Sequence, residues 1–225
     1  MENKSIALDG PAGAGKSTLA KRTAEHFGLI YVDTGALYRC IGLFAYRNNI
    51  ESRDKSGVIG LLPKISLEMN YDSFGVQRMI LNGEDVTDVI RKPEISTYAS
   101  DVSAMPEVRD FLLKMQRDMA VKYNVLMDGR DIGTVVLPNA GLKIFITADA
   151  KVRANRRYVE LKEKGIETSF DGVMEAMVTR DKNDSERKTA PLKAADDSVL
   201  LDTTNMNLDE SFAALCDIVN GRFGG

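Results

Sequence analysis

The chain is poor in several residue types that catalytic sites commonly use. Tryptophan is absent from its 225 residues, histidine occurs once, at position 26, and cysteine occurs twice. A single histidine gives no metal-ligand spacing of cysteines and histidines and little support for a Ser-His-Asp arrangement. Cys40 and Cys216 both lie in apolar helical patterns, so we expect buried free thiols rather than a disulfide, as suits a reducing cytoplasm.

Long apolar runs and a strong net charge are also missing. No apolar run approaches 18 residues, and the chain opens with no apolar signal segment, so we expect neither a membrane span nor an exported protein. The 30 basic and 33 acidic residues give a net charge of −3, which offers no general attraction for nucleic acid. We expect a cytoplasmic monomer with any polyanion site confined to a local region.

The most informative segment follows the apolar run Ser5–Leu8 and matches the pattern G-x-x-x-x-G-K-[ST]. Its glycines let successive backbone N–H groups face a polyphosphate, and the helix that follows adds its positive dipole end. Lys16 is expected to reach the β- and γ-phosphates, and the Ser17 hydroxyl to hold Mg²⁺. The residues predicted to bind ATP are Gly10, Pro11, Ala12, Gly13, Ala14, Gly15, Lys16, Ser17 and Thr18.

Short apolar runs alternate with helical patterns along the chain, which predicts an α/β fold with a parallel sheet and helices on both faces. The expected strands are Ser5–Leu8, Leu29–Val32, Val125–Met127, Lys143–Ile146 and Val199–Leu201. In this architecture ligands bind beyond the carboxyl ends of the strands. We therefore expect the segments that follow the first three strands to line one crevice.

Two segments interrupt this alternation. Residues 65–70 and 77–84 alternate apolar and polar positions around a turn, which predicts an antiparallel hairpin, with Val86–Ile90 as a third short strand. Charged helical stretches at 150–164 and 170–182 indicate an exposed, mobile arm. We predict a P-loop core of residues 1–61, 105–148 and 184–225, an insert of residues 62–104 and a helical lid of residues 149–183.

Polar residues follow the second and third strands. Asp33 or Thr34 can cap the next helix, which places Tyr38 and Arg39 about one turn later, where Arg39 could clamp a phosphate. Asp128 has the position of a Walker B carboxylate that could support Mg²⁺ through water. Arg130 could clamp a phosphate, and Asp131 could either accept from a sugar hydroxyl or orient that arginine.

A cationic face is expected on the first arm helix. Arg153, Arg156 and Arg157 share one side of it, and Arg180 and Arg187 follow in and after the second arm helix. Phosphoryl transfer needs positive charge around the migrating group, and a hinged arm could bring arginines there while excluding water. We predict catalytic roles for Lys16, Arg130, Asp131, Arg153 and Arg157.

Taken together, five segments resemble the bacterial-type cytidylate kinases, a family of nucleoside monophosphate kinases, over essentially the whole chain. They are GPAGAGKST (10–18), VDTGALYR (32–39), ASDVSAMPEVR (99–109), MDGRDIGTVVLPNA (127–140) and RDKNDSERKTAPLKAAD (180–196). The resemblance implies ATP-dependent phosphorylation of CMP and dCMP, with Mg²⁺ and with the insert recognising cytosine. Many relatives read GKGT at Lys16-Ser17-Thr18, so either hydroxyl is a candidate for the metal contact.

The resemblance also implies which residues meet the acceptor nucleotide. Ser100, Arg109 and Asp184 match positions at the base, and Thr34 matches a pyrimidine-pocket position. Those matching positions around the acceptor's phosphate and sugar are Tyr38, Arg39, Arg130, Asp131, Arg180 and Arg187.

The phosphate loop by itself leaves other functions open. A P-loop kinase of another small acceptor, such as a sugar acid, is one alternative, although paired arginines favour a phosphorylated acceptor. A nucleotide-binding switch is the other. Switch GTPases need a guanine-reading N-K-x-D motif, and the nearest string here, residues 182–185, lacks it.

Overall fold

The computed structural model describes residues 4–224, which divide into two compact units. The P-loop unit contains residues 4–31 and 123–224, and the second unit is Val32–Lys122. Among the described residues, no helix is both long and apolar enough to cross a membrane. The expected insert of residues 62–104 lies within the second unit and the expected lid of residues 149–183 within the P-loop unit, and their boundaries as functional domains stay predictions.

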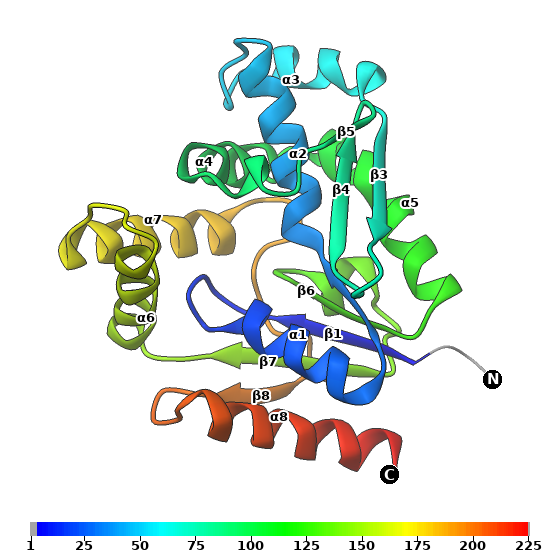
Figure 1. The fold of residues 1–225 in the computed structure, drawn as a ribbon, viewed down its shortest axis with the longest axis vertical. Coiled ribbons are helices and arrows are strands. Elements are labelled where there is room, and N and C mark those ends of the chain that lie inside the picture. Colours follow the sequence, from blue (N-terminus) through cyan, green and yellow to red (C-terminus); the bar gives the residue numbers. More distant parts are fainter. Residues whose placement is uncertain (1–3, 225) are drawn as a thin grey trace. The chain divides into compact units, whose positions relative to one another are not determined.

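A five-stranded sheet in the order β2-β6-β1-β7-β8 organises the P-loop unit (Figure 1). β1 (Ser5–Asp9) runs parallel to β6 (Val125–Gly129) on one side and to β7 (Leu142–Thr147) on the other. β8 (Val199–Asp202) pairs in parallel with β7, and the chain leaves the P-loop unit within β2 (Ile30–Asp33). The predicted α/β fold with a parallel sheet is therefore confirmed, and each strand lies within two residues of its expected position.

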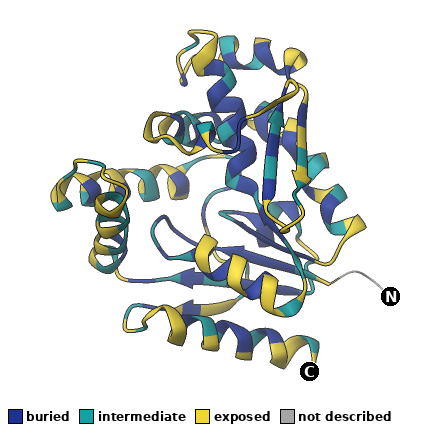
Figure 2. Cartoon of the chain, viewed as in Figure 1, coloured by how far each residue is buried: buried dark blue, intermediate teal, exposed yellow. Residues whose placement is uncertain are grey.

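One face of this sheet is covered by α1 (Lys16–Phe27) and α8 (Leu208–Phe223). The strands contribute residues that point to the same side, because Ile6 lies opposite Leu126 and Leu142, and Leu8 lies opposite Ile144. Figure 2 shows mostly buried residues in the central strands and exposed residues on the outer sides of α1 and α8. Such an amphipathic helix gains most of its stability from packing rather than from its own propensity.

The arm of the P-loop unit consists of α6 (Ala150–Glu163) and α7 (Phe170–Glu186). The two helices have a small apolar cluster of their own, formed by Ala154, Val173 and Met177 with partly buried neighbours. Asp149 and Ser169 accept from backbone N–H groups at the two helix starts, as expected of N-cap residues. The composition predicted an exposed arm, and most of its outer surface is exposed, but its inner side is packed.

The second unit combines four helices and a three-stranded antiparallel sheet. Its helices are α2 (Thr34–Arg47), α3 (Lys55–Leu61), α4 (Pro93–Val102) and α5 (Pro106–Lys122), with short 3-10 turns η1 (Leu62–Lys64) and η2 (Val89–Arg91). The sheet contains β3 (Leu67–Tyr71), β4 (Gln77–Leu81) and β5 (Glu84–Asp85). The predicted hairpin is present, since β3 and β4 pair antiparallel from Leu67 opposite Leu81 to Tyr71 opposite Gln77.

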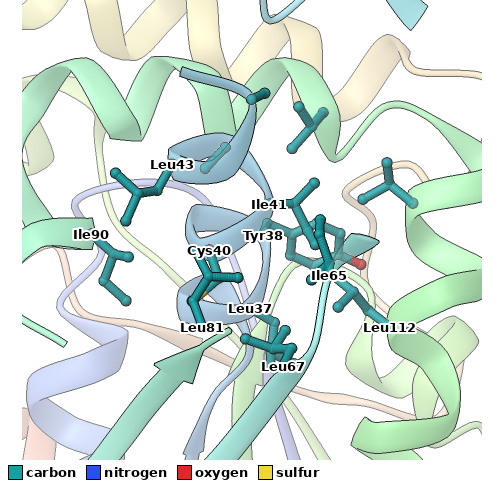
Figure 3. Close-up of a cluster of buried hydrophobic side chains, with 14 of the residues drawn as sticks. Leu37, Tyr38, Cys40, Ile41, Leu43, Ile65, Leu67, Leu81, Ile90 and Leu112 are labelled. Atoms are coloured by element: carbon teal, nitrogen blue, oxygen red, sulfur yellow. The ribbon is translucent and has the colours of Figure 1, made fainter. Parts of the chain in front are cut away.

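The core of the second unit is built around α2. Figure 3 shows residues of this helix, among them Leu37, Ile41 and Leu43, surrounded by apolar side chains from the hairpin, η2 and α5. A Cβ atom at Gly42 would lie 2.9 Å from the Cβ of Tyr98 and 3.1 Å from the amide nitrogen of Ala99. The missing side chain at Gly42 therefore lets α2 and α4 approach each other closely.

Several local expectations were wrong. The third strand is Glu84–Asp85 rather than Val86–Ile90, because the Thr87 hydroxyl accepts from the Met79 amide and its own amide donates to Asp85, which turns the chain there. Of the two expected caps of α2, Asp33 is the one that caps it, so this helix begins at Thr34. The helix α3 and a π-helical turn, η3 (Ile132–Val136), were not predicted.

Candidate active site

The phosphate loop connects β1 to α1, as the sequence predicted. Gly10, Gly13 and Gly15 all have positive φ angles, which L side chains rarely adopt. At Gly10 the constraint is double, since a Cβ atom there would overlap the carbonyl oxygen of Ile146 on β7. Only glycine allows the chain to leave β1 at this angle and curl towards the start of α1.

Lys16 is buried at the first position of α1, and its ammonium donates to the Pro11 carbonyl at 2.7 Å. Burial lowers the pKa of Lys16 well below its ordinary value, and the nearby positive charges of Arg130 and Arg180 lower it further. Asp128 and Asp9 act in the opposite direction. The three cations therefore share one small region, where a bound polyphosphate would relieve their mutual repulsion.

Ser17 and Asp128 link the phosphate loop to the end of β6. The Ser17 hydroxyl donates to one carboxylate oxygen of Asp128 at 2.7 Å, and the Tyr31 hydroxyl donates to the other at 3.2 Å. Because the hydroxyl uses its proton on Asp128, its oxygen lone pairs remain for a cation. Hard oxygen donors of this kind, together with phosphate oxygens, are what Mg²⁺ prefers. The residues therefore fit a magnesium ion.

A tight turn after β6 carries two of the predicted site residues. The Arg130 guanidinium donates through Nε to Asp184 at 3.0 Å and through Nη1 to the Gly129 carbonyl at 3.2 Å. Asp131 accepts from Arg187 at 3.4 Å, and both of these side chains are almost fully buried. The structure thus brings the turn and the end of α7 together through two neighbouring ion pairs.

The arm contacts the phosphate loop through Arg153 and Asp181. Arg153 donates to the Ala12 carbonyl at 2.8 Å and to Asp181 at 2.5 Å, while Asp181 also accepts from the Ala12 amide at 3.2 Å. Both backbone polar groups of Ala12 are therefore bound by arm residues. This contact fixes the inner side of α6 and α7 against the loop in the described conformation.

The other two arm arginines have different surroundings. Arg157 pairs with Glu160 at 2.7 Å on a partly exposed face, which is worth under about 1 kcal/mol for an exposed pair. Arg156 donates to Thr203 and to the Met206 carbonyl, so it ties α6 to the segment before α8. Of the three, Arg153 alone is shown bonded to the phosphate loop.

In the second unit, the start of α2 is held by Asp33 and Gln77. The Asp33 carboxylate caps the helix by accepting from the Ala36 amide at 3.1 Å. The Gln77 side chain accepts from the Asp33 amide at 2.8 Å and donates to the Asp33 carbonyl at 3.2 Å. Thr34 is buried as the first residue of this helix.

Further residues of the second unit form two linked groups. Arg39 donates to the Ser96 hydroxyl at 2.5 Å and to the Ile90 carbonyl at 3.3 Å. The Arg109 guanidinium lies 5.4 Å from the centre of the Tyr38 ring and donates to the Ser103 carbonyl at 3.0 Å. The Ser103 hydroxyl in turn donates to the Ser100 carbonyl at 2.8 Å, which connects α4 to the start of α5.

Comparison with known proteins agrees with these motifs. A family model described as cytidylate kinase matches residues 6–221. The chain belongs to the cytidylate kinase family. It is 48% identical over 210 residues to a cytidylate kinase of Caldicellulosiruptor bescii, covering 93% of this chain and 92% of that protein. A cytidylate kinase of Clostridium botulinum (strain Langeland) is 46% identical over 219 residues, covering 97% and 99%.

A solved structure supports the fold. An uncharacterized protein from Eubacterium ventriosum superposes with a TM-score of 0.53 at 13% identity, covering 98% of this chain and 99% of that one. At this identity the likeness speaks for the fold alone.

The structure brings together most of the predicted residues that lie in the P-loop unit. At the end of the phosphate loop, Lys16 binds the Pro11 carbonyl and Ser17 binds Asp128, and the adjoining ion pairs are Arg130–Asp184 and Arg187–Asp131. The residues expected in the second unit, which are Thr34, Tyr38, Arg39, Ser100 and Arg109, lie on α2, α4 and α5. Their roles stay predictions.

Three polar residues in and around the site were missed from the sequence, namely Asp9, Gln77 and Asp181. Asp9 ends a buried strand directly before the phosphate loop, and that placement of a charge was a usable signal. Asp181 stands next to Arg180 on the arm. Gln77 is a polar residue at a buried position of the hairpin, and its neighbours in the sequence gave no indication of its bonds to Asp33.

Proposed function

We propose that this chain transfers the γ-phosphoryl group of ATP to CMP and dCMP, producing CDP or dCDP and ADP. Membership of the cytidylate kinase family supports the substrate class. The structural observation that carries the proposal is the Ser17–Asp128 hydrogen bond beside buried Lys16, because it joins a phosphate loop to a Walker B carboxylate. The enzyme is proposed to act in the cytoplasm as a monomer.

The transfer is a direct in-line displacement. A phosphate oxygen of CMP attacks the γ-phosphorus while the bond from that phosphorus to the β,γ-bridging oxygen breaks, and the electron pair leaves with ADP. The CMP phosphate is already ionised at neutral pH, so no general base is needed. Lys16 stabilises charge on the transferring group, and the backbone of residues 10–18 holds the phosphates of ATP.

Magnesium would be held by the Ser17 or Thr18 hydroxyl and, through water, by Asp128. No group of three or more His, Cys, Asp or Glu side chains in residues 4–224 is placed to hold a metal ion. A magnesium ion at this site would take most of its ligands from the nucleotide phosphates and water. When bound, the ion would neutralise charge on the β- and γ-phosphates.

The lid arginines supply positive charge near the transferring group. Arg153 already lies against Ala12 of the phosphate loop. Arg157 would exchange its partly exposed partner Glu160 for a phosphate oxygen, at a cost of under about 1 kcal/mol. Their contribution is expected in kcat, because charge migrates only in the transition state.

The acceptor-binding residues are proposed from the positions that match the family. Arg39, Arg130, Arg180 and Arg187 are proposed to hold the CMP phosphate and sugar together with Tyr38 and Asp131. Ser100, Arg109, Asp184 and Thr34 are proposed to read cytosine. A site that accepts a hydrogen bond from the exocyclic amine of cytosine is left with an unpaired acceptor when uracil binds, which disfavours UMP.

A coupled assay with ATP and each of CMP, dCMP, UMP and AMP tests the proposal. The values of kcat/KM for CMP and dCMP should exceed those for UMP and AMP. Equal or better turnover of AMP would reject the cytidine assignment. Phosphorylation of a sugar acid, or ATP binding with no transfer to any monophosphate, would point to one of the alternative functions.

A further inference from the structure

Asp9 is a buried carboxylate that the proposed mechanism does not use. It is the last residue of β1, its relative exposure is 5%, and it directly precedes the phosphate loop. Its hydrogen bonds, however, do not go to that loop. The Ile132 amide donates to Oδ1 at 2.8 Å and the Gly133 amide donates to Oδ2 at 2.7 Å. Asp9 thus binds the segment after β6, more than 120 residues away along the chain.

The two amides belong to the start of the π-helical turn η3. The first N–H groups of any helical turn have no partner within the turn and need an acceptor from elsewhere. The usual acceptor is the side chain of the N-cap residue, which here is Asp131. The Asp131 side chain makes no capping hydrogen bond, and Asp9 takes that role from the neighbouring strand.

Because Asp9 caps the turn, the Asp131 carboxylate faces a different partner. Its Oδ1 accepts from Arg187 instead of from the turn beneath it. Its backbone carbonyl accepts from the Val135 and Val136 amides, which fixes the path of the turn. The preceding residue, Arg130, is held in the same turn by Asp184 and by the Gly129 carbonyl.

The sheet supports this arrangement. In the parallel pairing of β1 with β6, Asp9 lies opposite Gly129, only two residues before Asp131. A Cβ atom at Gly133 would lie 3.4 Å from Asp9 Oδ2 and 3.2 Å from the Lys143 side chain, so the turn fits tightly against β1 and β7. Both strands are buried parts of the sheet, which makes them rigid supports.

We infer that Asp9 is a positioning residue for the acceptor side of the active site. By capping η3 in place of Asp131, it sets the turn that presents Arg130 and Asp131 to the phosphate and sugar of the acceptor nucleotide. The inference rests on the proposed function. Although Asp9 directly precedes the phosphate loop in the sequence, its inferred effect is on binding of the acceptor nucleotide.

The substitution Asp9→Asn tests this inference with little change in volume. The side-chain oxygen of asparagine can accept a hydrogen bond from one of the two backbone amides. Its NH₂ group must then face the other amide, so one hydrogen bond is lost and two donors point at each other. We expect the KM for CMP to rise about 10-fold or more, with kcat reduced and the KM for ATP changed less than about two-fold. A matched control is Asp202→Asn. Asp202 ends β8 of the same sheet, and its carboxylate accepts hydrogen bonds from the amide and hydroxyl of the nearby Thr204.

The kinetic results separate the competing explanations. An increase in the KM for ATP equal to that for CMP would overturn the inference, because Asp9 would then support the phosphate loop. Unchanged kinetics for both nucleotides would also overturn it. If the wild-type enzyme itself fails to phosphorylate CMP, the proposed function fails, which is a different outcome.

The wild-type protein provides a second readout that does not depend on how well a variant folds. In amide-resolved NMR, the N–H groups of Ile132 and Gly133 should be protected from hydrogen exchange. Their resonances should shift when CMP is added and shift much less when ATP is added alone. Rapid exchange at both amides, or a response to ATP but not to CMP, would contradict the inference.

Discussion

The two units bury different kinds of polar group. The P-loop unit buries charged side chains, namely Asp9, Lys16, Asp128, Asp131, Lys143, Arg153 and Asp184. In the second unit, Arg109 is the one charged side chain that is buried among the described residues, and the other buried polar groups are neutral. Buried charge is costly unless it is paired and hydrogen-bonded, so its concentration in one unit calls for a functional reason.

The difference corresponds to two tasks. Transfer of a phosphoryl group requires fixed positive charge and the carboxylates that orient it, and these are what the P-loop unit holds. Under the proposed function, three of the four residues that read cytosine, Thr34, Ser100 and Arg109, belong to the second unit, whose core is apolar around α2. The following predictions test or sharpen this division, from the largest expected effect to the smallest.

The largest effect is expected from Lys16→Met, which keeps the length of the side chain and removes its charge. Because Lys16 is buried beside Arg130 and Arg180, loss of its charge should lower kcat about 10³-fold, as measured in the coupled assay. Thermal unfolding should show that the variant remains folded. A kcat within a few-fold of wild type would remove Lys16 from the chemistry.

The free-energy cost of burying the charged Asp9 carboxylate should be measurable from the pH dependence of stability. Burial raises the pKa of its carboxyl from 3.8 to about 6, with a smaller contribution from the charge of Asp131, while its two amide bonds and Lys16 oppose the rise. Between these values the folded protein binds more protons than the unfolded chain, so stability is lost as pH rises through about 6. The loss attributable to Asp9 is about 3 kcal/mol.

Urea unfolding of wild type and Asp9→Asn from pH 4 to pH 7 measures this loss. The free energy of unfolding of wild type should fall relative to that of the variant by about 2 kcal/mol over this range, since the rest of the total loss lies below pH 4. Asp202→Asn serves as a control, because hydrogen bonds from Thr204 lower the pKa of Asp202, so any pH effect of this carboxylate on stability has the opposite sign to that of Asp9. A constant difference between wild type and Asp9→Asn would contradict the assigned pKa.

The apolar core of the second unit should be sensitive to volume rather than to pH. Gly42→Ala places a Cβ atom 2.9 Å from Tyr98, so α2 and α4 must move apart. We expect a loss of about 2 kcal/mol in the free energy of unfolding, measured by urea denaturation. Gly60→Ala, at a helical position with open space around it, is the matched control and should cost nothing.

Asp184 tests whether the division between the units is complete, since it lies in the P-loop unit but is proposed to read the base. Asp184→Ala should lower the CMP-to-UMP ratio of kcat/KM about 10-fold. Because Asp184 also binds Arg130, the variant should have a lower kcat/KM for CMP as well. If the ratio stays the same while both rates fall, Asp184 only orients Arg130.

Local features were predictable from the sequence, and long-range features were not. The strand, loop and helix of residues 5–27 were predicted because each is encoded by neighbouring residues. The bonds from Asp9 to η3 and from Ala12 to Asp181 join residues 124 and 169 positions apart, for which a single sequence carries no local pattern. The π-helical turn was missed for a related reason, because its conformation depends on an acceptor from another strand.

The CMP-to-UMP ratio of kcat/KM tests the division of tasks most directly when it is measured in one variant from each unit. Ser100→Ala changes a neutral group of the second unit, and Lys16→Arg changes a charged group of the P-loop unit that is proposed to serve both acceptors equally. We predict that Ser100→Ala lowers the ratio about 10-fold while Lys16→Arg slows both reactions and leaves it unchanged. A ratio that changes in Lys16→Arg but not in Ser100→Ala would contradict the account.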